Sequence, residues 1–381
     1  ILAALAATTT RAADERIAQI REMSLADVLD IDISTGTSKS LRQAPAVAYV
    51  ITADDIERVG ARNLLEVLQT LPGLNVHLAQ AGVNSPIIDL RGSFSERGGH
   101  ILFLHDGKPL RLLANATMPE IFRLPVSFVE RIEVIRGPAS AVYGADALAG
   151  AVNIITRKAP AEVGARAGDA DQRGAWAGTN GSTALLDWSI ASSYSRNSDD
   201  VPTRSIPQAR TFTQTFRHEY TDIDVKLRAG PFSANLWALN YDKIETGNPT
   251  NPRGRTEIET QHRHYEVGYA AEFSPTTQFK ATAFSTRFTG YKQGEIQQGV
   301  PTDGKNAEER KTIDLSLTET RFSGHRLRFT LTAFSERRIP LDNVPPPPPG
   351  APPAPSNDPR RVNAVSVQDE WSFAENWELT A

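Results

Sequence analysis

The chain has 381 residues, a net charge of −4 and no cysteine. The absence of cysteine excludes disulfide scaffolds, thiolate metal sites and cysteine nucleophiles. The basic residues form no stripe, so we expect no nucleic-acid partner. Mean hydropathy is −0.35, and the longest apolar run, residues 1–7, is far shorter than the roughly 20 residues of a membrane helix. Any membrane-spanning part must therefore be built from strands.

The N-terminal region divides into two parts by composition. The apolar run at residues 1–7 leads through threonines into Arg11, Ala12 and Ala13, which is typical of the end of a signal peptide with a small-residue cleavage site. We expect residues 1–13 to be a signal-peptide remnant, with an ordinary apolar N-terminus as the alternative. Residues 14–43 form a polar N-terminal extension.

Residues 44–158 mix helix, strand and glycine-turn signals. Thr52 is a good N-cap, with Asp55 in the first turn, and Gly60 ends that helix. Asn63 caps a second helix, with Glu66 three residues later and leucines at helical spacing up to residue 71. Short strands are expected at residues 48–51, 87–90, 101–104, 129–135 and 152–156. The pattern predicts a compact α+β domain with its own core.

Residues 159–381 follow a period of two, which gives each strand an apolar and a polar face. We expect the apolar faces to contain Tyr265, Val267, Tyr269 and Phe273; Trp188, Ile190 and Tyr194; Trp237, Leu239 and Tyr241; Leu327, Phe329 and Leu331; and Val367, Trp371 and Phe373. Strands of about ten residues and aromatic strand ends favour a membrane β-barrel over a soluble β-sandwich. Tight turns at residues 230–231 and 274–276 alternate with long loops expected at residues 197–210, 246–257, 290–309 and 342–359.

Six runs of the middle region occur in a characteristic order: residues 44–52, 63–76, 89–92, 101–110, 129–138 and 150–156. In order and spacing they resemble the plug domain of TonB-dependent outer-membrane receptors, nearest to the cobalamin and siderophore branches. The resemblance implies a 22-stranded transmembrane barrel closed around the plug. Residues 159–381 hold only about ten such strands, so we expect a partial barrel and a chain that is a fragment of a longer protein.

The same resemblance predicts a coupling segment, the TonB box, ahead of the plug. It is typically an acidic residue followed by aliphatic residues and Thr or Ser. The matching residues here are Asp30, Ile31, Asp32, Ile33, Ser34 and Thr35. Such a segment binds its partner by strand addition, in which backbone hydrogen bonds supply the affinity. Asp32 interrupts the usual aliphatic run, so the register stays open, as does the alternative of a polar linker.

The resemblance also implies roles for charged and polar plug residues. Plug residues expected to meet opposite charges on the inner barrel wall are Arg91, Glu130, Arg131, Glu133 and Arg136; solvated surface charge is the alternative. Outward plug loops at residues 77–85 and 110–117 offer substrate contacts, with Gln80, Asn84, Arg111 and Asn115 as the polar candidates.

No catalytic or cofactor site is expected. The sequence shows no Ser/His/Asp set or paired catalytic carboxylates, and its glycines form neither a P-loop nor a dinucleotide fingerprint. His262 and His264 share one strand face, but no third ligand lies near them in sequence. We therefore predict no enzyme activity, no cofactor and no metal site.

The resemblance implies TonB-dependent active transport of a scarce nutrient, an iron–siderophore, cobalamin or a similar small molecule or metal chelate, across a Gram-negative outer membrane. The expected partners are TonB with its inner-membrane energising complex, outer-membrane lipid and the substrate. Two alternatives stay open: a surface receptor or signal transducer without transport, and a soluble β-sandwich binding protein.

Overall fold

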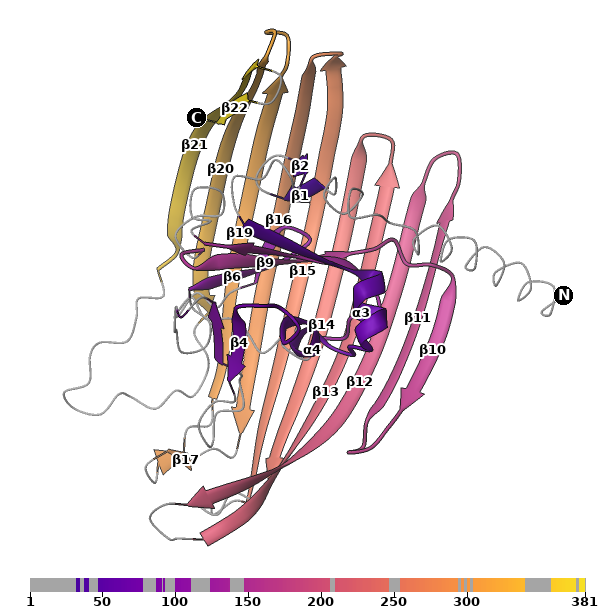
Figure 1. The fold of residues 1–381 in the computed structure, drawn as a ribbon, viewed down its shortest axis with the longest axis vertical. Coiled ribbons are helices and arrows are strands. Elements are labelled where there is room, and N and C mark those ends of the chain that lie inside the picture. Colours follow the sequence, from indigo (N-terminus) through magenta and orange to yellow (C-terminus); the bar gives the residue numbers. More distant parts are fainter. Residues whose placement is uncertain are drawn as a thin grey trace, which may run out of the picture. The chain divides into compact units, whose positions relative to one another are not determined.

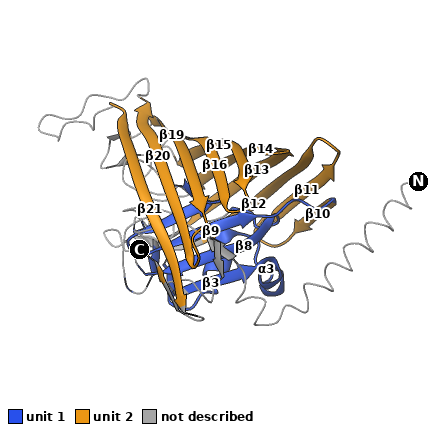
Figure 2. Cartoon of the chain, turned by 90° about the horizontal axis from the view of Figure 1, so that it is seen from above, with its two compact units in different colours: residues 1–161 blue, residues 162–381 orange. Residues whose placement is uncertain are grey.

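The computed structural model describes residues 32–34, 38–40, 47–77, 87–90, 92, 100–110, 124–137, 147–205, 210–246, 254–293, 296–297, 300–301, 304–339, 358–374 and 377–380. The chain forms two compact units, Ile1–Ala161 and Glu162–Ala381, which Figure 2 colours separately. Among the helices in these ranges, none combines the length and apolarity needed to span a bilayer.

The first unit is an α+β domain around a five-stranded sheet in the order β3-β8-β9-β6-β7. Strands β6 and β9 are parallel, and the other neighbours are antiparallel. Two small sheets, β1-β2 and β4-β5, complete the described strands of the unit. Its elements (Figure 1) are β1 Asp32–Ser34, β2 Ser38–Ser40, β3 Val47–Thr52, α3 Ala53–Val59, α4 Leu64–Leu68, β4 Leu74–His77, β5 Ile87–Leu90, β6 Ile101–His105, β7 Lys108–Leu110, β8 Val129–Arg136 and β9 Gly150–Thr156.

Both predicted helix starts are confirmed. The Thr52 hydroxyl accepts a hydrogen bond from the Asp55 backbone N–H, and the Asp55 carboxylate accepts one from the Thr52 backbone N–H, which makes a full capping box. Gly60 ends α3 in the left-handed conformation at φ 72°, as a C-terminal glycine does. Asn63 caps α4 through the backbone N–H of Glu66. Local sequence therefore fixes where these helices begin.

The core of the first unit lies on and around its sheet. One buried cluster consists of Leu102, Leu104, Ile135, Ala147 and Ala151. Next to it, a Cβ placed on Gly150 would lie 2.3 Å from the Ile135 carbonyl oxygen, far inside contact distance. Only glycine fits where β9 passes this close to β8.

The second unit is one 11-stranded antiparallel sheet in which neighbours follow chain order, apart from the small hairpin β17-β18 between β16 and β19. In Figure 1 these strands stand side by side in sequence colours. Its elements are β10 Glu162–Ala167, β11 Arg173–Ser182, β12 Asp187–Ser205, β13 Arg210–Ala229, β14 Phe232–Thr246, β15 Arg255–Ser274, β16 Thr277–Gln293, β17 Ile296–Gln297, β18 Val300–Pro301, β19 Gly304–Glu319, β20 His325–Ile339, β21 Arg360–Ala374 and β22 Trp377–Thr380. A single consecutive sheet confirms the partial barrel and excludes the β-sandwich.

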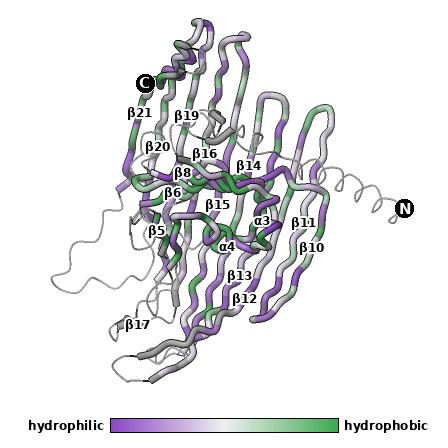
Figure 3. Tube along the Cα trace, in the orientation of Figure 1, coloured by the Kyte–Doolittle hydropathy of each residue, from purple (hydrophilic) through white to green (hydrophobic). Residues whose placement is uncertain are grey.

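The two faces of this sheet differ in chemistry, and Figure 3 shows hydropathy alternating along its strands. The apolar face carries exposed large side chains, among them Ile223, Phe232, Tyr265, Val267, Ile313, Phe329, Leu331, Val365, Val367 and Trp371. The polar face carries buried polar side chains, among them Ser193, Gln214, His218, Asp222, Lys243, Glu245, His262, His264, Thr282, Glu308, Thr312 and Glu336. Exposed apolar and buried polar residues are the inverse of a soluble sheet and typical of a membrane barrel.

The predicted apolar face of β14 is wrong. Trp237 pairs with Asp224 on one side and His264 on the other, so it lies on the polar face, and Leu239 and Tyr241 follow it. Leu236 instead pairs with Val225 and Tyr265 on the apolar face. Large apolar residues lie on both faces of β14, so the period of two in its sequence does not show which face belongs to the apolar face of the sheet. The register with β13 and β15 determines this.

The predicted strand length and two predicted loops are also wrong. We expected strands of about ten residues, whereas β13 and β15 each have 20. The loop expected at residues 197–210 is mostly strand, because β12 runs to Ser205 and β13 begins at Arg210. The polar residues of this segment continue the backbone hydrogen bonds between β12 and β13, because strand pairing does not require apolar side chains. Within residues 290–309, β16 runs to Gln293, the β17-β18 hairpin follows and β19 begins at Gly304.

We predict that Thr52→Ala lowers the stability of α3 by about 1 kcal/mol, because Ala cannot accept the bond that caps the helix. The measurement is amide hydrogen exchange of α3 in the full chain. Thr52→Ser, which keeps the hydroxyl, is the matched control. Equal protection in the alanine variant and the wild type would contradict the assigned cap.

A second prediction concerns acid sensitivity at α4. Partial burial alone would raise the pKa of Glu66, but hydrogen bonds and charge from Arg62, with a further bond from Asn63, outweigh it and bring the pKa below its ordinary value of 4.5. The carboxylate therefore stabilises α4 fully above pH 4.5, and that stability is lost as pH falls through the lower folded pKa. In hydrogen exchange corrected for intrinsic rates, α4 should lose protection in this range. Glu66→Gln should remove this pH dependence; an unchanged profile in that variant would refute the linkage.

Candidate functional site

The predicted coupling segment lies partly in strand β1. Asp32, Ile33 and Ser34 form β1, and Ile33 pairs with Lys39 of β2 in an antiparallel register. In the part of the chain that the structure describes, β1 pairs with β2 alone. The segment therefore has the extended backbone that strand addition needs, and it already uses one edge in a hairpin of three residue pairs.

Glu133 is the centre of a buried polar network in the plug. Its side chain is only 1% exposed. It accepts a hydrogen bond from Arg131 Nε at 2.9 Å and one from Asn153 Nδ2 at 3.2 Å. Asn153 Oδ1 in turn accepts from the Gly107 backbone N–H at 3.0 Å. This network connects β8 and β9 with the turn after β6, so the Glu133 charge is compensated inside the unit.

The outer members of this charged set differ in exposure. Glu130 is paired with Arg131, but its side chain is 51% exposed. Arg136 donates from Nη1 to the Pro72 carbonyl at 2.7 Å, and its guanidinium lies 3.9 Å from the centre of the Tyr49 ring. Arg136 thus connects β8 to β3 and to the turn after α4 through a hydrogen bond and a cation–π contact.

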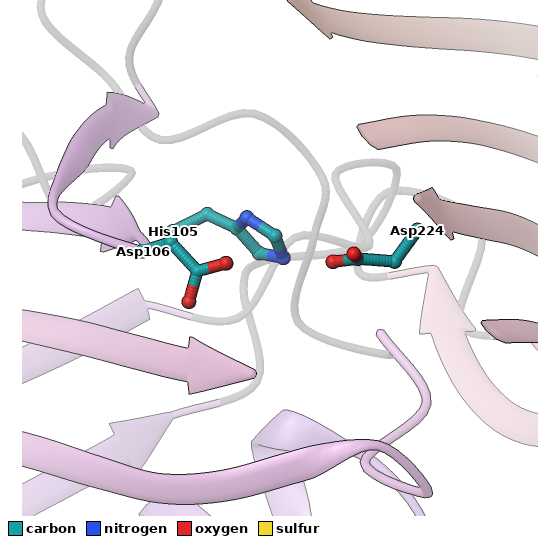
Figure 4. A group of neighbouring side chains, drawn as sticks. All are labelled: His105, Asp106 and Asp224. Atoms are coloured by element: carbon teal, nitrogen blue, oxygen red, sulfur yellow. The ribbon is translucent and has the colours of Figure 1, made fainter. Parts of the chain in front are cut away.

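A tight turn at residues 106–107 joins β6 to β7. Both Asp106 and Gly107 have positive φ, 47° and 77°, which suits a two-residue hairpin. The Asp106 carboxylate accepts hydrogen bonds from the Thr156 backbone N–H at 2.8 Å and from its hydroxyl at 2.6 Å. Figure 4 draws Asp106 beside His105, the buried last residue of β6; Asp224, in the same view, belongs to the second unit. The Asp106 carboxylate thus fixes the turn to the end of β9.

The polar face of the second unit carries aromatic and histidine clusters. His218 Nδ1 lies 2.9 Å from the Tyr241 hydroxyl, and the Tyr220 and Tyr241 rings stack with centres 4.4 Å apart. His262 and His264 share this face, as expected, and their rings contact Phe288 and Phe284. His218, Tyr220 and Tyr241 are buried, so the stacked rings and the imidazole–hydroxyl contact satisfy one another on this face.

Many predicted site residues lie outside the described residues. They are Asp30, Ile31 and Thr35 of the coupling segment, the plug arginine Arg91, and the substrate candidates Gln80, Asn84, Arg111 and Asn115. Residues 1–13 lie outside them as well. The predicted contacts with the barrel wall stay predictions for Glu130, Arg131, Glu133 and Arg136. The partners described above for these residues all belong to the first unit.

Sequence reasoning missed two parts of this site. Asn153 and Thr156 form hydrogen bonds with residues 20 and 50 positions away in sequence. Such pairs depend on sheet register, which a local sequence pattern does not reveal. The Asp106–Gly107 dipeptide, by contrast, is a strong hairpin signal on its own. The His218–Tyr241 contact could likewise be predicted only from the register of β13 with β14, because it joins these two strands.

We predict that Glu133→Ala lowers the stability of the first unit by roughly 3 kcal/mol, since it removes one partner from a buried, hydrogen-bonded pair. Amide exchange of β8 and β9 in the full chain measures this. Glu130→Ala removes the exposed partner of the same arginine and should change stability by less than about 0.5 kcal/mol. Equal effects of the two substitutions would refute the buried network.

Comparison with known proteins finds relatives of the plug unit in sequence and of both units in fold. Residues 40–151 match the TonB-dependent receptor plug domain. The vitamin B12 transporter BtuB of Vibrio vulnificus (strain CMCP6) is 36% identical over 124 residues, which cover 32% of this chain and 20% of that protein. A mutant of the ferric enterobactin receptor PfeA from Pseudomonas aeruginosa matches at a TM-score of 0.66 and 20% identity, covering 89% of this chain and 57% of that one.

The siderophore receptor PirA from Acinetobacter baumannii gives a TM-score of 0.67 at 16% identity, again over 89% of this chain and over 56% of that chain. This chain thus spans just over half the length of the solved structures that it matches. Residues 40–151 are thus similar to a TonB-dependent receptor plug domain, and the chain shares the fold of the solved receptors, a plug joined to part of an antiparallel barrel sheet.

Proposed function

We propose that this chain takes part in TonB-dependent uptake of a scarce nutrient across a Gram-negative outer membrane. The observation that carries the proposal is a plug domain followed by an 11-stranded sheet with one apolar and one polar face. An exposed apolar face suits contact with acyl chains, and a polar face suits a lumen that holds a plug. A surface receptor without transport would share this scaffold, so the test below measures binding and uptake separately.

The substrate class that we propose is an iron–siderophore or cobalamin. The sequence similarity to a vitamin B12 transporter supports cobalamin, and the fold shared with ferric enterobactin and other siderophore receptors is compatible with siderophores. Fold alone does not fix the cargo. As contacts we propose the plug residues Gln80, Asn84, Arg111 and Asn115, which offer amide and guanidinium groups for hydrogen bonds.

Energy coupling in this proposal runs through residues 30–35. Strand addition to TonB would use the backbone of β1, and the ligand would bias an equilibrium between a retained and a released segment. Force transmitted to the plug would then act on its charged residues. We propose Arg91, Glu130, Arg131, Glu133 and Arg136 as contacts with the barrel wall, because buried pairs hold a plug in place with modest net stability.

We predict that Ile33→Pro abolishes energised uptake while leaving substrate binding intact. Proline lacks the backbone N–H and fixes φ, so it interrupts strand pairing at the centre of β1. The measurement is uptake of radiolabelled ferric enterobactin and cyanocobalamin by energised cells carrying the full-length protein. Binding of the same two compounds to unenergised cells is measured in parallel.

Lys39→Pro is the matched control, since Lys39 is the hairpin partner of Ile33. It disrupts β2 but leaves residues 30–35 able to pair with another protein, so uptake should persist. Wild-type uptake in the Ile33→Pro variant would overturn the coupling mechanism. Binding of either compound without uptake in the wild type would support the receptor alternative.

A further inference from the structure

Two arginines lie next to each other on the polar face of the second unit. Arg326 and Arg328 are two residues apart in β20, so they share one face and their Cα atoms are roughly 7 Å apart. That face is the polar one, because the buried Glu336 lies an even number of residues further along the same strand. Both arginines are half-buried. Two guanidinium groups at this spacing can hold one anion between them.

The arginine pair carries more positive charge than its neighbours neutralise. Within the described part of the chain, neither arginine forms an ion pair or a side-chain hydrogen bond. Arg326 lies opposite Glu370, which accepts a hydrogen bond from Gln368 Nε2 at 3.1 Å. On β19, Asp314 lies opposite Thr332 and accepts a hydrogen bond from its hydroxyl at 2.7 Å. One opposite carboxylate cannot neutralise two guanidinium groups, and a half-buried cation without a counter-charge is costly, so the pair favours a bound anion.

The surface around the pair consists of hydroxyl, amide and ammonium groups. Register places five polar side chains in the two rows of the sheet that contain Arg328 and Thr330: Gln278, Thr318 and Gln368 in the first, and Lys280 and Ser316 in the second, where Ser366 also lies. Hydroxyl and amide groups can donate further hydrogen bonds to the oxygen atoms of an anion. The chemistry of this surface therefore suits a carboxylate or a phosphate.

The pair also lies at the short-turn end of its strand. Arg326 is the second residue of β20, which follows the turn of residues 320–324, whereas the far end of β20 leads into the connection of residues 340–359. In outer-membrane barrels short turns face the periplasm and long connections face outward. The arginine pair thus lies at the periplasmic end of the polar face, which a solute on its way inward passes last.

We propose that Arg326 and Arg328 bind an anionic oxygen group, a carboxylate or phosphate, of the transported solute as it leaves toward the periplasm. Two charge-assisted contacts on an open wall give weak binding, and a site on a conduction path must release its ligand. The inference rests on the proposed function and deepens it, because it requires a cargo that carries such a group.

The first test measures binding of radiolabelled inorganic phosphate to the full-length protein in phosphatidylcholine nanodiscs by equilibrium dialysis. The variant Arg326→Gln/Arg328→Gln should lower the affinity by about tenfold, because it removes both donors of charge-assisted hydrogen bonds. Arg326→Lys/Arg328→Lys keeps the charge and should lose only about threefold, since lysine binds phosphate as a point charge. The control Arg263→Gln/Arg287→Gln removes the same charge from neighbouring strands on the apolar face and should bind like the wild type.

Equal phosphate affinity in the wild type and the Arg326→Gln/Arg328→Gln variant would overturn the anion site. An equal loss in the control pair would also overturn it, because net charge and not this pair would then be responsible. If the wild type takes up neither ferric enterobactin nor cyanocobalamin, the proposed function fails on its own, and the phosphate measurement still decides the site.

The second test compares uptake of these two compounds by energised cells with their binding to unenergised cells. Arg326→Gln/Arg328→Gln should slow uptake of a transported compound severalfold and leave its surface binding unchanged, because the pair lies at the periplasmic end. Wild-type uptake in a variant that has lost phosphate binding would show that the pair holds a free anion, which would overturn its role toward the cargo.

Discussion

Cross-strand register is the constraint on which the second unit depends. Side chains alternate with a period of two, so a slip of one residue would move every apolar side chain of a strand to the polar face. The antiparallel ladder avoids this over long strands: β12 and β13 stay in step from Asp187 to Ser205. Shifts occur near the short turns, between Glu272 and Ser274 and between Ser372 and Ala374. Irregularities at the strand ends leave the chemistry of the two faces intact.

The plug is held together by a different set of forces. Its sheet contains a parallel pair, β6 and β9, so segments distant in sequence must meet without a hairpin. The buried apolar cluster that contains Leu104 and Ile135 supplies the non-directional part of the stability. Directional contacts come from buried polar groups, among which Glu133 and Asn153 connect β8, β9 and the turn at residue 107. Leaving one such group unpaired costs more than the intact bond contributes, which makes this arrangement specific.

What the sequence predicts depends on the range of the interaction. Caps at Thr52 and Asn63 involve neighbours three residues away, and both were predicted correctly. The faces of β15 followed from one strand alone, because the large apolar residues between Tyr265 and Phe273 lie on one side. The face of β14 did not, since Leu236 and Trp237 have similar hydropathy and only pairing with β13 and β15 separates them. Site contacts such as Asp106 with Thr156 depend on register in the same way, and the substrate loops lie outside the described residues.

Backbone pairing serves two opposite purposes in the proposed mechanism. In the barrel sheet each inner strand must have both edges paired, because an unpaired N–H or C=O in hydrocarbon costs several kcal/mol. The coupling strand must instead offer an edge to another protein. Strand β1 has three residue pairs with β2, and an isolated hairpin of that size is marginally stable in water. A partner that pairs with residues 30–35 over a longer edge therefore competes against a weak contact. The N-terminal hairpin and the barrel sheet are thus both held by backbone hydrogen bonds between strands. In a short hairpin in water, these bonds can be replaced by bonds to a partner; in long strands surrounded by hydrocarbon they cannot.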